Sequence, residues 1–350
     1  MMQTLNVMMV GPRGVGKSSL IAAMYERLQP EFNNTGCRLV PVTTTGAKLA
    51  ERLGQLKALG DEYMPTGGRD GDAKVLDYEF EIGPVKGNPS LKLTFNDVPG
   101  RYYSSEADPN DLKLVDEHLA QAAASVIAID TPALIEERGK YHESINRPGQ
   151  IRDLYQRVLS ATNGSRFVIL APVRCEAYLA EKRGQSRAKE LLDCVQKGYE
   201  GLLGILKQSE FRDRIAVVVT PVQTVGCLRF SRFNTTSGRP EAIFRKFTHE
   251  ATYKPVDCEQ PLRYILRYLL DLHTAHVQQN KGIWDRLVPD FVKEFLRSLP
   301  LPDFFSDALA KAFTDDKHLQ NVINSISRGL KREGGGFSIV QGGNFFAPRS

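Results

Sequence analysis

The stretch from Met8 to Leu28, "MMVGPRGVGKSSLIAAMYERL", constrains the fold of this chain more than any other. An apolar run over residues 5–10 leads into closely spaced glycines, and a helix-favouring run with apolar side chains on one side follows from Lys17. This order predicts a buried strand, a glycine loop and a helix. The segment "GPRGVGKS" satisfies the pattern G-x-x-x-x-G-K-[ST] in the structural context that the pattern requires.

The glycine loop predicts a site for a chain of phosphates. Its glycines let the backbone turn its amides inward at a helix N-terminus, which carries about half a positive charge. We expect Lys17 to reach the β- and γ-phosphates and the Ser18 hydroxyl to ligate Mg²⁺, which prefers oxygen ligands. The candidate phosphate-binding residues are Gly11, Gly14, Val15, Gly16, Lys17, Ser18 and Ser19.

Composition excludes several other classes of protein. The chain has 350 residues, of which 41% are hydrophobic and 25% charged, as in ordinary globular proteins. The formal net charge of +5 comes without a long basic block, so charge gives no strong signal for nucleic acid or an anionic membrane. No apolar run is long enough for a transmembrane segment, and the five cysteines include no C-x-x-C pair. We therefore expect a cytoplasmic protein with reduced thiols.

A second apolar run, residues 91–96, leads into the segment "DVPG". In a parallel sheet Asp97 would lie at the carboxyl end of its strand, beside the glycine loop, where a carboxylate can help to hold Mg²⁺. Gly100 is spaced to offer its amide to the γ-phosphate, a contact that hydrolysis would release. This Asp-x-x-Gly pattern resembles that of the GTPase superclass of Ras-like and translation-factor GTPases, and the version with Pro99 looks most like the translation-factor-related branch.

The resemblance implies a place for base recognition. Where that superclass has Asn-Lys-x-Asp or Thr-Lys-x-Asp, this chain has the similar "VRCE", with Arg174 in the role of the lysine and Glu176 in that of the aspartate. A guanidinium can stack on a purine, and a carboxylate can accept from the N1 and N2 donors of guanine, which adenine lacks. The alternative is an ion pair within the loop. Thr220, after the next apolar run, is a candidate for a backbone contact to the base.

A GTPase of this type also needs a threonine that reaches Mg²⁺, and the sequence offers two places. Thr66 lies in a Gly-rich segment directly ahead of the apolar run 75–81, which fits the topology of the superclass best. The trio at 43–45 is the alternative, although Thr45 could simply cap the helix that follows, and neither place need be the right one.

The residue after Gly100 bears on catalysis. Ras-like GTPases have a water-orienting glutamine there, whereas this chain has Arg101, so we expect slow hydrolysis in the absence of a partner. Arg13 and Arg101 are each either a cation that stabilises the transferring phosphoryl group or a solvated side chain.

The order of elements predicts a three-layer α/β fold with a doubly wound, mainly parallel sheet. The expected strands are 5–10, 75–81, 91–96, 125–130, 166–171 and 214–219, and the second is expected to pair antiparallel with the third. A helix over 258–276 is expected to close the sheet.

The predicted domain organisation has three parts. Residues 1–280 form the GTPase domain, with a helical insertion at 31–64 and a hairpin-like insertion at 226–255. Residues 281–332 are expected to form a helical extension. Residues 333–350 form a Gly-rich tail, either a mobile one or a strand added to the sheet of a partner.

The whole arrangement resembles bacterial GTPases of the double-GTPase type found in conflict and signalling systems. That resemblance implies a switch that binds GTP or GDP with Mg²⁺ and works with an effector, an activating protein or a second copy of itself, in a setting such as phage defence. An ATPase or phosphotransferase with the same loop, and a nucleotide-binding scaffold with little hydrolysis, remain the alternatives.

Overall fold

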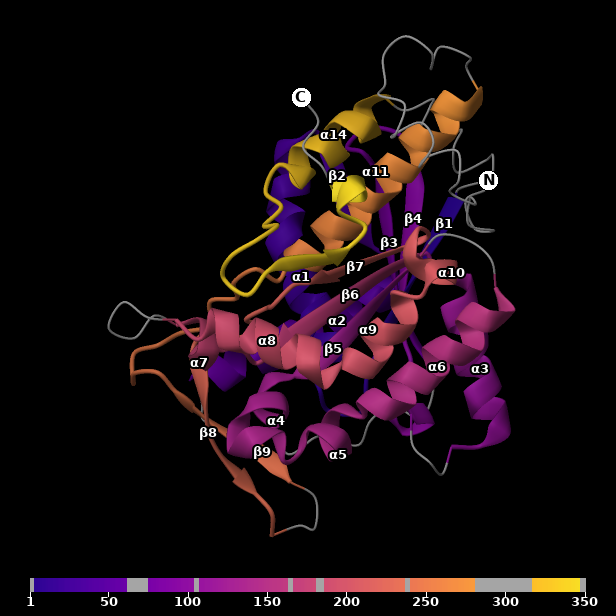
Figure 1. Ribbon diagram of the computed structural model, residues 1–350. Coiled ribbons are helices and arrows are strands. Elements are labelled where there is room, and N and C mark those ends of the chain that lie inside the picture. The colour runs from indigo at the N-terminus through magenta and orange to yellow at the C-terminus, as the bar shows by residue number, and fades with distance from the viewer. Residues whose placement is uncertain are drawn as a thin grey trace.

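The computed structural model describes residues 3–61, 75–103, 107–162, 166–180, 186–236, 240–280 and 317–346. Within these residues the fold is α/β, with an eight-stranded sheet in the order β10-β7-β6-β5-β1-β4-β3-β2 (Figure 1). The strands of this sheet are β1 Gln3–Val10, β2 Cys37–Pro41, β3 Leu76–Pro84, β4 Leu91–Asp97, β5 Ala124–Asp130, β6 Arg166–Val173, β7 Ile215–Val219 and β10 Ser338–Gln341. The predicted fold class is therefore confirmed.

The central strands run parallel and are buried on both faces. β1 pairs with β4 and β5, β5 with β6, and β6 with β7, all in parallel. Every residue of β5 and of β6 is buried, which explains why these strands appear in the sequence as continuous apolar runs. β3 pairs antiparallel with β4, as expected. All six strands predicted from the sequence are present, with ends shifted by up to three residues.

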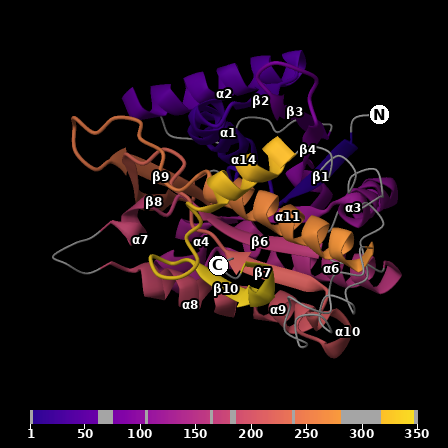
Figure 2. The ribbon, with the colours of Figure 1, turned by 90° about the horizontal axis from the view of Figure 1, so that it is seen from above.

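Helices cover both faces of the sheet (Figures 1 and 2). The α-helices are α1 Lys17–Asn34, α2 Thr43–Asp61, α3 Pro109–Gln121, α4 Thr131–Ile135, α5 His142–Asn146, α6 Pro148–Ala161, α7 Glu176–Leu179, α8 Ala188–Gly198, α9 Glu200–Leu206, α10 Ser209–Arg212, α11 Gln260–Asn280 and α14 Lys317–Ser327. The apolar core on one face joins the sheet to α1, α11 and α14, and the core on the other joins it to α3, α6, α8 and α9. α11 is the expected closing helix.

The segment predicted as a helical insertion, 31–64, is only partly helical. α1 continues to Asn34, β2 follows as an edge strand antiparallel to β3, and α2 comes next. The first turn of α2 is fastened to β3 because the Thr45 hydroxyl accepts a hydrogen bond from the amide of Glu79 at 2.8 Å. The sequence "CRLVP" is too short to show a strand by periodicity, which is why the prediction missed β2.

The end of the chain is built into the fold. β10 pairs antiparallel with β7 at the edge of the sheet, as Figure 2 also shows, so this strand joins the sheet of its own chain rather than that of a partner. The short 3₁₀-helix η4, Gly343–Phe346, places the ring of Phe346 5.3 Å from that of Phe167 and 5.1 Å from that of Tyr264. The described part of the predicted tail is therefore packed, with Phe346 fully buried.

The insertion expected at 226–255 is a hairpin. β8 Leu228–Asn234 and β9 Glu241–Lys246 pair antiparallel in a separate two-stranded sheet that projects from the body of the protein (Figure 1). It lies between the last parallel strand and α11, as the sequence predicted.

Candidate functional site

The glycine loop, which we call the phosphate loop (residues 11–18), joins the carboxyl end of β1 to α1. Gly11, Gly14 and Gly16 have φ angles of 138°, 80° and 107°, a region that residues with a Cβ avoid. Among the described residues no side chain caps the N-terminus of α1, and its first turn contains no acidic residue. The first amides of an 18-residue helix therefore face the loop without a competing carboxylate, an arrangement that favours an anion.

Lys17 lies inside the phosphate loop. Its Nζ donates hydrogen bonds to the carbonyls of Gly11 at 2.7 Å and Pro12 at 3.2 Å, and lies 3.7 Å from Asp97 Oδ1. The side chain is buried, and this burial lowers the pKa of Lys17 while the nearby Asp97 opposes the shift. The ammonium is therefore desolvated beside the phosphate loop, where a bound anion would stabilise its charge.

Ser18, in the first turn of α1, contacts Asp97 at the end of β4. Asp97 ends β4 and is in register with Met9 of β1, so the parallel pairing brings it to the phosphate loop. The Ser18 hydroxyl donates to Asp97 Oδ2 at 2.5 Å. The sequence placed these two side chains together, and the structure has them in contact.

Ser18 and Asp97 also suit the metal that the sequence suggested. A hydroxyl and a carboxylate oxygen are the kind of ligand that Mg²⁺ takes, and Mg²⁺ completes its shell with waters and substrate phosphates rather than with an all-protein cage. In the described parts of the chain no group of three His, Cys, Asp or Glu side chains could hold a metal ion. The pair of oxygen donors on Ser18 and Asp97 fits Mg²⁺ better than zinc, which mainly takes nitrogen and sulfur ligands.

Gly100 touches the phosphate loop through its backbone. A Cβ on this residue would lie 1.8 Å from the amide nitrogen of Arg13 and 2.4 Å from the carbonyl carbon of Pro12. Only glycine fits here, because the obstructing atoms belong to the backbone. The short 3₁₀-helix η1, Gly100–Tyr103, begins at this contact.

Arg174 reaches the phosphate loop from the far side. It follows β6 with a φ of 59°, and its guanidinium donates to the carbonyl of Gly14 at 2.6 Å and to Asp130 Oδ2 at 2.5 Å. Arg174 thus forms an ion pair with Asp130 at the end of β5, and not the ion pair within its own loop that the sequence left open. The same guanidinium also lies on the phosphate loop.

Glu176 begins α7 and is buried. Its Oε1 accepts hydrogen bonds from the amides of Val225 at 3.2 Å and Gly226 at 3.1 Å. Burial raises the pKa of Glu176, and the hydrogen bonds from backbone amides oppose that shift. In this structure the carboxylate braces the loop after β7 (residues 220–226). This contact differs from the direct base contact expected from the sequence, although the side chain lies between the two loops that the resemblance assigns to the base.

Thr220 begins the loop after β7. Its amide donates to the carbonyl of Leu170 at 2.9 Å, which ties the loop to β6. The buried Thr220 hydroxyl has no hydrogen-bond partner among the described residues.

The structure describes only some of the residues that the sequence suggested for catalysis and for the metal. Thr66 and the side chain of Arg101 lie outside the described residues. The threonines at 43–45 start α2, beyond an edge strand that lies three strands from β1, and Thr45 is bound to β3. Arg13 is exposed on the phosphate loop, while Val15 is buried beneath it and Ser19 is half-buried.

Sequence reasoning missed Asp130 and Phe244. Asp130 ends the apolar run of β5 at the same sheet edge as Asp97, so the signal that identified Asp97 could have identified it as well. Phe244 lies on the hairpin, and its ring centroid is 5.4 Å from the Arg174 guanidinium carbon. No local pattern in the sequence indicates that contact.

Comparisons with known proteins leave the family unassigned. No protein-family model matches the chain, and no curated protein matches it. The signal recognition particle receptor SRb-GTP/SRX complex from Chaetomium thermophilum is similar at 15% identity and a TM-score of 0.37, over 63% of this chain and 91% of that one. The GTP-bound Ski7 GTPase-like domain of S. cerevisiae is similar at 16% identity and a TM-score of 0.36, over 63% of this chain and 43% of that one. The structure of sup35 complexed with GDP is similar at 14% identity and a TM-score of 0.30, over 64% of this chain and 38% of that one. This chain therefore spans less than half the length of the Ski7 and sup35 chains.

Among the helices in the described part of the chain, none is both long enough and apolar enough to cross a bilayer.

Proposed function

We propose that this protein is a switch that binds GTP with Mg²⁺, hydrolyses it slowly and acts on protein partners. One observation carries the proposal: Lys17, Ser18 and Asp97 converge at the uncapped N-terminus of α1. A desolvated cation, a helix N-terminus and two oxygen ligands together match the charges of a triphosphate with its metal.

Each residue of this cluster has a separate task in the proposed complex. The amides of the phosphate loop bind phosphate oxygens, and the Lys17 ammonium exchanges its bonds to loop carbonyls for bonds to the β- and γ-phosphates. Ser18 and Asp97 would hold Mg²⁺, which when bound neutralises charge on the phosphates. Thr66 stays our proposal for a further oxygen ligand.

The proposed preference for guanine rests on Arg174 and Glu176. The Arg174 guanidinium lies on the phosphate loop at Gly14, where a planar cation can pack on a purine. Glu176 places a buried carboxylate between the end of β6 and the loop after β7. A carboxylate there favours guanine over adenine, because adenine has no paired N1 and N2 donors.

The proposed switch rests on Gly100. Its backbone touches the phosphate loop, so a γ-phosphate seated there acts directly on the start of η1. Loss of that phosphate removes its contact with Gly100 and so changes the surface at the start of η1 that a partner can bind. The partner is an effector, an activating protein or a second copy of the chain, and a defence or signalling setting follows from the resemblance alone.

Parallel titrations with GTP and ATP in Mg²⁺ test the proposal. We expect the wild type to prefer GTP, and Glu176→Ala to reduce that preference by about 10-fold or more. Lys17→Ala should lower the affinity for both nucleotides. Glu190→Ala, at an exposed ion pair on α8, is the matched control and should leave both affinities unchanged. Equal affinity of the wild type for GTP and ATP would favour the ATPase or phosphotransferase.

Equal binding of a protein partner in the presence of GDP, GTP and a non-hydrolysable analogue would favour the scaffold.

A further inference from the structure

Arg174 is held in a backbone conformation that arginine seldom adopts. Its φ of 59° lies in the left-handed region, which costs a residue with a Cβ roughly 1 kcal/mol or more. The surroundings of Arg174 must therefore hold it there. Apart from the Gly14 carbonyl, the structure gives its guanidinium two partners that come from elements distant in the sequence, Asp130 and Phe244.

Asp130 is a rigid anchor for that guanidinium. It is 1% exposed and ends β5 in register with Val173, the residue before Arg174. Its Oδ2 accepts from Arg174 at 2.5 Å, and its Oδ1 accepts from the amide of Ala133 at 2.9 Å. Its own amide and carbonyl are both bound by the side chain of Asn146, at 2.7 and 3.0 Å. Every polar atom of Asp130 is thus engaged, and the residue has little freedom to move.

Phe244 supplies an apolar contact from the hairpin. Its ring centroid lies 5.4 Å from the guanidinium carbon of Arg174, within the range of a cation–π interaction. The ring is 9% exposed and lies opposite Phe230 in the β8–β9 pairing, with the two ring centroids 6.2 Å apart and edge to face. The inserted hairpin therefore contacts the nucleotide site through a side chain that its own packing fixes.

We propose that Asp130 and Phe244 are positioning residues that hold the Arg174 guanidinium across the phosphate loop. The Arg174 side chain then fixes the position of both the base and the phosphates of the nucleotide. This inference rests on the proposed function, since Arg174 acts here on a bound purine nucleotide. Asp130 fixes the guanidinium by charge and direction, and Phe244 limits its movement on the hairpin side. The projecting hairpin is thereby coupled to nucleotide retention without itself binding phosphate.

A double-mutant cycle on the full chain tests the inference. The readout is the rate at which a fluorescent GDP analogue dissociates with Mg²⁺ present, for Asp130→Asn, Phe244→Leu and Arg174→Ala alone and in pairs. We expect each of the first two substitutions to speed dissociation by about 5- to 50-fold, and to have less than about a 2-fold effect once Arg174 is alanine. Asp116→Asn removes an exposed ion pair with Arg157 on another part of the surface and should change nothing.

The outcomes separate this inference from the proposed function. If the wild type retains GDP while Asp130→Asn and Phe244→Leu leave its dissociation unchanged, or act equally with and without Arg174, the positioning role is overturned and the proposed function stands. If the wild type binds no guanine nucleotide, the proposed function itself fails. Phe244→Leu keeps an apolar side chain, so the cycle with Arg174 can be completed on this variant even if Asp130→Asn does not fold.

Discussion

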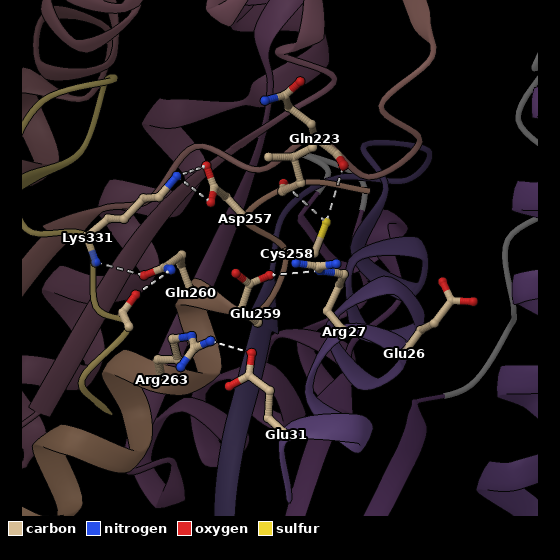
Figure 3. Close-up of polar contacts among 12 residues, drawn as sticks. Glu26, Arg27, Glu31, Gln223, Asp257, Cys258, Glu259, Gln260, Arg263 and Lys331 are labelled. Atoms are coloured by element: carbon tan, nitrogen blue, oxygen red, sulfur yellow. Dashed lines mark hydrogen bonds and ion pairs between the residues drawn. The ribbon is translucent and has the colours of Figure 1, made fainter. Parts of the chain in front are cut away.

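The Nζ of Lys331 lies 2.7 Å from Oδ1 of Asp257, and this ion pair fastens the C-terminal segment beside the start of α11 (Figure 3). Gln260 reinforces the junction, because its amide donates to the carbonyl of Gly329 at 2.9 Å and accepts from the amide of Lys331 at 3.0 Å. One residue before Asp257, Val256 exchanges backbone hydrogen bonds with Gln223 in the loop after β7. The end of the chain thus supports the loop that Glu176 braces.

Two substitutions at this junction should differ in their effect on stability. Gln260 is buried, so Gln260→Ala removes two hydrogen bonds to the backbone together with the packing of a buried side chain, and we expect it to lower the free energy of unfolding by about 1–3 kcal/mol. Lys331→Met should cost about 1 kcal/mol, because the lysine side chain is half exposed while the Asp257 carboxylate that loses its partner is 10% exposed. Urea unfolding of both variants measures the difference, and equal losses would contradict this description of the junction.

A buried histidine should make the stability fall in mild acid. His142 Nδ1 lies 3.1 Å from the side-chain Nδ2 of Asn146, which also donates to the carbonyl of Asp130. Because Asn146 Nδ2 is a donor, His142 Nδ1 accepts, and His142 Nε2 donates to the carbonyl of Gly198. Burial lowers the pKa of His142, although the Gly198 hydrogen bond and Glu143 oppose the shift. The unfolded chain therefore binds the proton first as the pH falls below about 6.5.

Unfolding free energies at pH 7.5 and 5.5 test this dependence. The wild type should lose stability over that interval, and His142→Gln should lose less of it. His249→Gln, at an exposed histidine, should behave like the wild type. An identical pH dependence in wild type and His142→Gln would show that another group is responsible.

Lys17 should cost stability when no nucleotide is bound. Burial lowers the pKa of Lys17, so the folded chain disfavours the charged form, and stability should rise with pH between the lowered value and the ordinary value of 10.5. Lys17→Met removes the buried charge, so we expect it to stabilise the nucleotide-free protein at neutral pH and to weaken GTP binding severely. Thermal unfolding measured with and without GTP checks both effects, and a destabilised nucleotide-free variant would show that the ion pair with Asp97 outweighs desolvation.

Hydrolysis of GTP by the isolated protein should be slow. Arg101 occupies the position at which the resemblance places a water-orienting glutamine, and Arg13 on the phosphate loop is one of the two arginines proposed to stabilise the transferring group. We expect a turnover far below about 10 per second, as is typical of GTPases without an activating partner. Arg13→Ala should lower the turnover further. Single-turnover phosphate release measures it, and rates of tens per second without a partner would refute this account of catalysis.

Much of the fold follows from patterns that the sequence displays locally. The buried parallel strands appear as apolar runs, and the glycine pattern of residues 11–16 fixes the loop and the start of α1, because residues with a Cβ seldom adopt those φ angles. Parallel pairing then brings Asp97 to Ser18. These relations need only short-range patterning and a single topological rule.

The remaining features depend on contacts between distant segments. β2 and β10 are short edge strands whose place is set by the neighbours with which they pair, and neither has a periodic pattern of its own. The partners of Arg174 come from β5 and from the hairpin, 44 residues before it in the case of Asp130. The hydrogen bonds of Glu176 to Val225 and Gly226 likewise join two loops that are distant in the sequence, so no local pattern predicts them.

We propose above all that the phosphate loop binds a guanine nucleotide whose Mg²⁺ is held by Ser18 and Asp97. Its most direct test is a crystal structure of the protein grown with Mg²⁺ and a non-hydrolysable GTP analogue. We expect a triphosphate against the amides of residues 11–18, with the metal ion between those two side chains and the base beside Arg174. Density for the analogue elsewhere, or a structure without bound analogue at saturating concentration, would contradict it.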